Sequence, residues 1–183
     1  MLDVQNLAAK YAAIQHEAVL HADDKALRRH ITDTLKCCLP PQLVTTALIE
    51  ACFRTVQHQS DAADPMHTGA IHAFAGQYLQ ETASDNPLLQ RLHASAQRLL
   101  PAKQPATRDD IRLVVLDALY QPGLLPPGTH LAYLNHRLGR NGHPRLSCEE
   151  IAVRMHKPIT YIHELESAIL TILSAHYNGG RHA

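Results

Sequence analysis

The spacing of apolar residues is the feature that most constrains the fold of this chain. Apolar side chains recur three and four residues apart over most of the sequence, and they alternate with polar ones over no convincing stretch. A period of three to four places apolar groups along one side of a helix, whereas a half-buried strand needs a period of two. The sequence therefore predicts an all-α fold.

Residues 1–100 are expected to form a helical bundle that serves dimerisation or partner binding. The apolar positions of its predicted helices are, in order, Val4, Leu7, Tyr11, Ile14 and Ala18; Leu27, Ile31 and Leu35; Leu43, Ala47, Leu48, Cys52 and Val56; Ile71, Phe74, Ala75, Tyr78 and Leu79; and Leu89, Leu92, Ala96 and Leu99. The second helix is predicted to stop at Pro40 and the third to begin at Pro41, because proline suits the first turn of a helix. The polar residues 59–65 are predicted to form a loop.

Residues 101–107, with the sequence PAKQPAT, are predicted to be a linker. They contain two prolines and no large apolar side chain, which is typical of a hinge between domains. We place the domain boundary there, so residues 108–183 form the second domain. Asp109 and Asp110 lie where acidic groups favour the start of a helix. That helix is predicted to end before Pro122, and by sequence it could belong to either domain.

Charge and cysteine content narrow the functional classes. The 17 basic and 17 acidic residues cancel, so no general cationic field is available and any nucleic-acid contact must be local. The four cysteines show no zinc-like spacing, which favours a reduced, cytoplasmic protein. No signal pattern and no apolar run near the roughly 20 residues of a membrane span is present, so no membrane partner is expected.

The histidines do not indicate an enzyme by their spacing. His16 and Glu17 begin like a zinc-protease helix, but His21 falls at the fifth position instead of the fourth. His67 and His72 have the same gap, which turns them to different sides of a helix. Only a metal assembled from distant histidines is left open. With no phosphate-binding loop and no GxSxG motif, we expect a non-enzyme without catalytic residues, metal or cofactor. A further hypothesis is that the 14 histidines make stability or assembly depend on pH between about 5 and 7.

The sequence after residue 125 predicts two helices joined by a short turn. Ser147 and Glu150 form a capping-box pattern, which starts a helix at Ser147. His156-Lys157 is the predicted turn, and Pro158 suits the first turn of the next helix. The inner faces comprise Ile151, Ala152 and Met155 in the first helix, and Ile162, Leu165, Ile169, Leu170 and Leu173 in the second. Two helices joined in this way are typical of a helix-turn-helix motif.

The same stretch carries a more specific pattern. Its members, without a gap in spacing, are Arg137, Gly139, Asn141-Gly142, Leu146-Ser147, Glu149-Glu150-Ile151-Ala152, Ile162, Leu165-Glu166 and Leu170. In this pattern residues 125–173 resemble the C-terminal promoter-recognition domain of housekeeping-class bacterial sigma factors. The resemblance implies a domain that docks on RNA polymerase and places its second helix in the major groove of the upstream promoter element.

The second helix departs from the family pattern where that family carries basic residues. Pro158 replaces a serine, and Ile159, Tyr161, His163 and Ala168 occupy positions that are commonly basic. Arginine and lysine are the groups that pair with phosphates and guanine edges, so the usual DNA-binding face is depleted. The DNA-contacting residues that we predict are Arg140, Arg145, Arg154, His156, Lys157, Thr160, Tyr161 and His163.

Two functional hypotheses follow from these departures. In the first, the chain is a bacterial transcription-associated regulator that binds promoter DNA as a homodimer, because two half-sites compensate a weak module. In the second, it is an adaptor that docks on RNA polymerase, a sigma factor or an antagonist through Ile159 and Tyr161 without reading bases. A complete sigma factor is not expected, because tryptophan is absent and phenylalanine occurs only at Phe53 and Phe74.

Overall fold

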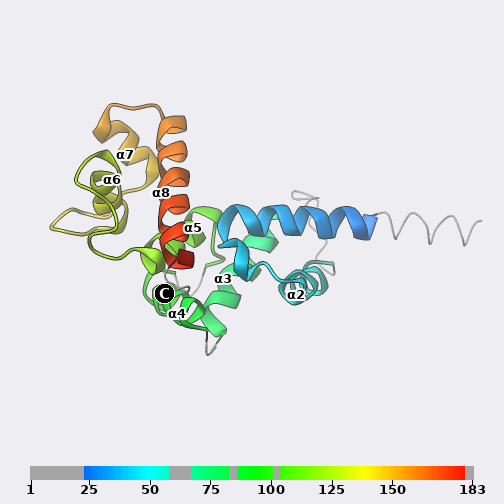
Figure 1. Cartoon of the computed structure of the whole chain (residues 1–183). Helices are drawn as coiled ribbons and strands as arrows, with labels where there is room; N and C mark the ends of the chain where they lie inside the picture. Colours follow the sequence, from blue (N-terminus) through cyan, green and yellow to red (C-terminus); the bar gives the residue numbers. More distant parts are fainter. Residues whose placement is uncertain (1–22, 58–66, 83–85, 101–103, 180–183) are drawn as a thin grey trace, which may run out of the picture.

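The computed structural model describes residues 23–57, 67–82, 86–100 and 104–179 of the chain. Within these ranges the chain forms helices joined by loops and contains no strand, which confirms the all-α prediction (Figure 1). No helix in the described ranges combines the length and the apolar character that crossing a membrane would require.

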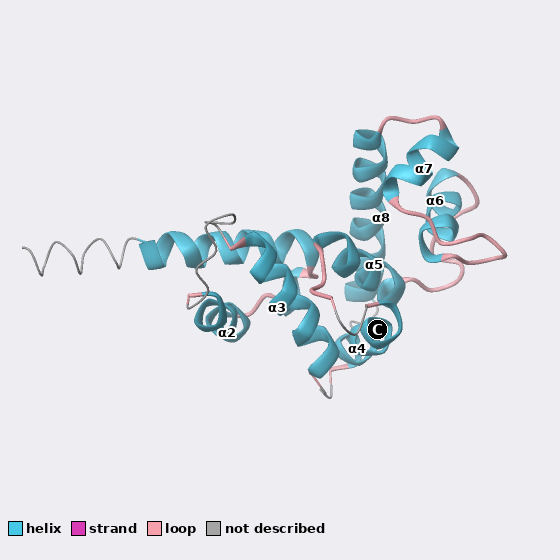
Figure 2. Cartoon of the chain, turned by 180° about the vertical axis from the view of Figure 1, so that it is seen from behind, coloured by secondary structure: helices cyan, strands magenta, loops and turns pink. Residues whose placement is uncertain are grey.

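The elements follow one another as a series of helices. The chain forms a helix over 23–38, the 3-10 turn η1 (Pro41–Leu43), α2 (Thr46–Val56), α3 (Thr68–Glu81), α4 (Pro87–Leu99), α5 (Arg108–Leu119), α6 (Thr129–Leu138), α7 (Cys148–Met155) and α8 (Ile159–Gly179). The helix over 23–38 lies on one side of α5, and α6 and α7 lie on the other, beside α8 (Figure 1, Figure 2). The predicted apolar seam over 4–18 and the predicted loop over 59–65 lie outside the described residues.

The segment after Pro40 differs from its prediction. The single helix expected from Pro41 is wrong, because Pro41–Leu43 makes one 3-10 turn and α2 begins only at Thr46. The side-chain oxygen of Thr45 accepts a hydrogen bond from the amide of Leu48 at 3.2 Å, and this cap starts the helix. Ala47, expected on the buried face, is exposed as a result.

Helix α5 lies at the centre of the molecule. Its residues 111–119 are all buried, and it packs against both α4 and α8. A capping box starts it, in which Thr107 accepts from the amide of Asp110 and the Asp110 carboxylate accepts from the amide of Thr107. The buried apolar residues of both halves of the chain form one continuous cluster around α5. Helix α5 therefore packs with the helices on both sides of residues 101–107 in the sequence. The domain boundary expected at 101–107 stays a prediction.

Helices α7 and α8 form the two-helix unit expected from the sequence. The predicted capping box at Ser147 and Glu150 is confirmed, with the Glu150 amide 3.2 Å from the Ser147 hydroxyl and the Ser147 amide 2.7 Å from the Glu150 carboxylate. Helix α7 ends at His156, which adopts a left-handed φ of 53°. Pro158 lies one residue before α8, and its carbonyl oxygen accepts the amide of Ile162 at 3.4 Å.

Candidate nucleic-acid interface

Residues 153–161 form an exposed end of the α7–α8 unit, which we call the tip. Arg154, His156, Lys157 and Thr160 are all exposed there, and Tyr161 is half-buried. The turn is held by the backbone, because the amide of Lys157 donates to the carbonyl of Ala152 at 3.0 Å. The Lys157 Nζ lies 5.6 Å from the centroid of the Tyr161 ring. The structure thus brings together the predicted DNA-contacting residues from Arg154 to Tyr161.

The other predicted DNA-contacting residues lie away from the tip. Arg140 is half-buried, donates to Asp117 Oδ1 at 2.8 Å, and stacks over the Tyr120 ring at 4.6 Å from its centroid. Because Asp117 also accepts from Ser95 at 2.6 Å, Arg140 takes part in a polar cluster that joins the loop after α6 to α4 and α5. Arg145 is exposed in the loop between α6 and α7.

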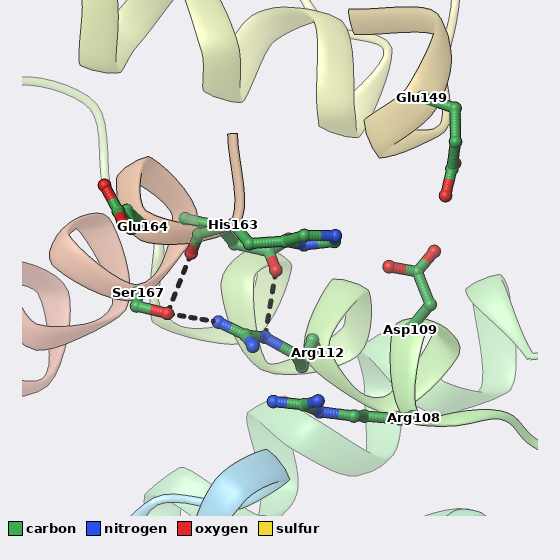
Figure 3. Close-up of a pocket in the computed structure, with 8 residues that line it drawn as sticks. Arg108, Asp109, Arg112, Glu149, His163, Glu164 and Ser167 are labelled. Atoms are coloured by element: carbon green, nitrogen blue, oxygen red, sulfur yellow. Dashed lines mark hydrogen bonds and ion pairs between the residues drawn. The ribbon is translucent and has the colours of Figure 1, made fainter. Parts of the chain in front are cut away.

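His163 faces a pocket between α5, α7 and α8. The pocket has a volume of about 620 Å³, and its lining includes Arg108, Asp109, Arg112, Glu149, His163 and Ser167 (Figure 3). The Arg112 guanidinium donates to the Ser167 hydroxyl at 2.9 Å, and that hydroxyl donates to the His163 carbonyl at 2.9 Å. Hydrogen bonds from its own backbone amide and from Ser147 lower the pKa of Glu149. The pocket therefore combines cationic, anionic and imidazole groups.

A buried ion-pair network lies beneath the tip and joins α5, α6 and α8. Glu166, of which only 1% is exposed, accepts a hydrogen bond from the Tyr133 hydroxyl at 2.8 Å. Arg112 Nε lies 2.9 Å from one carboxylate oxygen of Glu166, and Arg137 Nε lies 3.4 Å from the other. Arg137 also pairs with Asp109, which begins the network on α5. A carboxylate buried this deeply is tolerated because two guanidinium groups and a hydroxyl compensate its charge.

The sequence patterns assign no role to this network. Arg137 and Glu166 appear in them only as members of the family pattern, and Arg112 and Tyr133 do not appear at all. A signal is present, because Glu166 lies between Leu165 and Ile169 on an apolar stripe. A glutamate in that position requires a buried basic partner, although the sequence does not say which arginine supplies it.

The chain matches no protein-family model, no curated protein and no solved structure. The resemblance of residues 125–173 to the sigma-factor domain therefore rests on the residue pattern alone.

Proposed function

We propose that this protein is a transcription-associated regulator that binds duplex DNA through the tip. The observation that carries the proposal is the exposure of Arg154, Lys157 and Thr160, which lie in or beside the turn between α7 and α8. The N-terminal end of α8 lies at the edge of the molecule, away from α4 (Figure 1). The second helix of a helix-turn-helix unit enters the major groove by this end. Unpaired amides and the helix dipole at an N-terminus also favour phosphate groups.

The side chains of the tip divide by the contacts that they can make with DNA. Arg154 and Lys157 supply positive charge for phosphates, a sequence-independent contact. Thr160 has a hydroxyl in the first turn of α8, where such groups reach base edges. Glu164, exposed one turn further along α8, opposes a wider anionic contact. With so few cations, one tip binds weakly, and we propose that a homodimer presents two tips to two half-sites.

The proposal is tested by replacing both cations of the tip. In Arg154→Ala/Lys157→Ala, retardation of genomic DNA fragments at low salt should weaken by about tenfold or more on every fragment, because phosphate contacts carry no sequence information. The matched control is Lys25→Ala/Arg29→Ala, which removes two exposed cations from the helix over 23–38. Equal weakening in both double variants, or no retardation of any fragment by the wild-type chain, would contradict DNA binding through the tip.

A second candidate function is docking on a protein, which the apolar side chains of the tip favour. Val153 is 76% exposed and Ile159 is 36% exposed, and the half-buried Tyr161 belongs to the tip as well. Exposed apolar side chains together with a partly exposed aromatic ring are typical of the centre of a protein interface. RNA polymerase, a sigma factor and an antagonist are the partners that the family resemblance suggests.

Affinity capture from the native host, with and without nuclease, separates the two candidate functions. A protein adaptor should retain its partner after nuclease treatment and in Arg154→Ala, and should lose it in Val153→Asp. A DNA-binding regulator should lose co-purifying polymerase on nuclease treatment, because the DNA links the two.

A further inference from the structure

Three side chains with metal-binding atoms meet where α7 packs on α8, and two of them, His163 and Glu166, also line the pocket between α5, α7 and α8. The Cys148 sulfur, a ring nitrogen of His163 and a carboxylate oxygen of Glu166 all lie within 4.8 Å of one another. Cys148 is the first residue of α7, whereas His163 and Glu166 lie three residues apart on α8, a spacing that puts them on neighbouring positions of one helix face. The contact between α7 and α8 thus creates a cluster that neither helix has alone.

The donor atoms of this cluster suit one class of ion. Thiolate sulfur, imidazole nitrogen and carboxylate oxygen are the ligands of Zn²⁺ and of related divalent transition metals. With metal–ligand distances of about 2.0–2.3 Å, the ligands of a tetrahedral site lie about 3.5 Å apart. Small side-chain movements would therefore bring the three atoms to binding distance of one ion. The His163 ring can move the most, because it is exposed.

The surroundings of the cluster provide the support that a metal ligand requires. Metal-binding carboxylates are oriented by polar residues around them. Glu166 is held in this way by a hydrogen bond from Tyr133 at 2.8 Å and by ion pairs with Arg112 at 2.9 Å and Arg137 at 3.4 Å. Because a carboxylate has about four lone-pair positions, these contacts leave room for an ion.

The charges around the cluster are also compatible with a bound cation. Asp109 Oδ1 lies 3.9 Å from the Cys148 sulfur. The Asp109 and Glu149 carboxylates point toward each other across the pocket, and the His163 ring extends toward the space between them (Figure 3). Together with Glu166, these carboxylates offset the positive charge that Arg112 and Arg137 place nearby.

We propose that Cys148, His163 and Glu166 bind a divalent transition-metal ion of the zinc class, with a water molecule in the fourth position, facing the pocket. The Cys148 thiol releases its proton to solvent when its sulfur binds the ion. The ion links the first turn of α7 to α8. This inference does not depend on DNA binding, because none of the three ligands lies in residues 153–161.

Local spacing could not reveal this site. Cys148 and His163 lie far apart in the sequence, and neither belongs to a CxxC or HxxxH pattern. Sequence spacing leaves open only a metal assembled from distant histidines, whereas the fold assembles one histidine with a cysteine and a glutamate.

Cobalt titration of the full chain, purified with a chelator, tests the proposal. Co²⁺ bound to a thiolate gives a sulfur-to-metal charge-transfer absorption, which should appear and saturate at one ion per chain. Cys148→Ser should abolish this absorption, while the matched control Cys37→Ser, which alters an exposed cysteine, should keep it. Absence of the absorption in the wild-type chain, or its persistence in Cys148→Ser, would overturn the proposal.

A second variant, His163→Ala, tests the site even if Cys148→Ser does not fold. His163 is exposed, so His163→Ala should fold normally yet bind Co²⁺ at least tenfold more weakly. Zn²⁺ should raise the thermal unfolding midpoint of the wild-type chain, because an ion that binds only the folded state stabilises it, and should raise that of His163→Ala less. Equal Co²⁺ affinity in the wild-type chain and His163→Ala would contradict the assignment of His163 as a ligand.

Discussion

The buried network and the tip lie in the same stretch of sequence, but they relate to the family resemblance in opposite ways. Arg137 and Glu166, which match the sigma-factor pattern, are 3% and 1% exposed and hold α5, α6 and α8 together. Pro158 and Ile159, which depart from it, lie at the exposed tip. The residues that match the sigma-factor pattern therefore pack the helices together. The residues that depart from it determine what the exposed surface can bind.

This difference predicts two kinds of mutational effect. Removing one partner of a buried ion pair leaves an uncompensated charge in the interior and costs stability. Removing an exposed cation changes little in the fold, because solvent already screens its charge. Stability should therefore depend on the network, and binding on the tip.

The largest effect is expected from Glu166→Gln. The substitution leaves Arg112 and Arg137 buried without the carboxylate, so the free energy of unfolding should fall by about 3–5 kcal/mol. Urea denaturation in the presence of a chelator measures this loss without any contribution from bound metal. Glu164→Gln, at an exposed position on the same helix, should change stability by less than about 0.5 kcal/mol. Equal losses in the two variants would remove the contrast between buried and exposed charge.

A smaller effect is expected at Gly139, which ends α6 between the network and the loop. Its φ is +64°, and a Cβ there would lie 3.1 Å from the backbone nitrogen of Arg145. Gly139→Ala should cost about 2 kcal/mol, because a left-handed conformation alone costs roughly 1–2 kcal/mol for a residue with a Cβ. Gly142 has a φ of +79°, but a Cβ there would meet no atom within 4 Å, so Gly142→Ala serves as the control and should cost about 1 kcal/mol. If Gly142→Ala unfolded at a lower denaturant concentration than Gly139→Ala, the close approach of Arg145 to residue 139 could not be the cause of a larger loss at Gly139.

Removal of the α7 cap should have an effect of about 1 kcal/mol. Ser147→Ala deletes the hydroxyl that accepts from the Glu150 amide, and such caps contribute about this amount. Ser147→Asn should restore most of the loss, since asparagine caps helices as well as serine does. Chemical denaturation of the wild-type chain and the two variants provides the measurement. If Ser147→Asn were as unstable as Ser147→Ala, loss of the cap would not be the cause.

The smallest effect concerns pH. Burial, with positive charge on His143 and Arg154, lowers the pKa of His136, whose ring lies 4.3 Å from that of His143. The folded chain therefore favours the neutral His136 ring, and this preference stabilises the fold above the unfolded pKa of about 6.5. The stabilisation is lost as pH falls through the lower pKa of the folded chain. The unfolding midpoint should fall on acidification below about pH 6.5, and less steeply in His136→Gln. An identical pH profile for both chains would rule out this contribution.

The fold is largely predictable from the sequence because its signals are local. Apolar periodicity and the capping box at Ser147 each act within a few residues, and together they are enough to predict α7 and α8. The segment after Pro40 shows the limit of local signals, because the cap at Thr45 outweighs a proline that also suits a helix start.

The candidate site is predictable only where its residues are neighbours in sequence. Arg154 to Tyr161 lie together because one short turn holds them. Arg140 shows the converse, since its attachment to Asp117 depends on how α5 packs, which no local pattern encodes. The cluster of Cys148, His163 and Glu166 likewise exists only after α7 and α8 meet.

The salt dependence of binding to duplex DNA measures how many phosphates the tip contacts. For the full chain, the logarithm of the binding constant should fall linearly with the logarithm of salt concentration, with a slope of about −2 per tip if Arg154 and Lys157 each displace one counterion. Arg154→Ala/Lys157→Ala should bring that slope close to zero while leaving the free energy of unfolding unchanged. A slope that is the same in the wild-type chain and the double variant, or an absence of binding at low salt, would contradict the claim that the tip binds DNA.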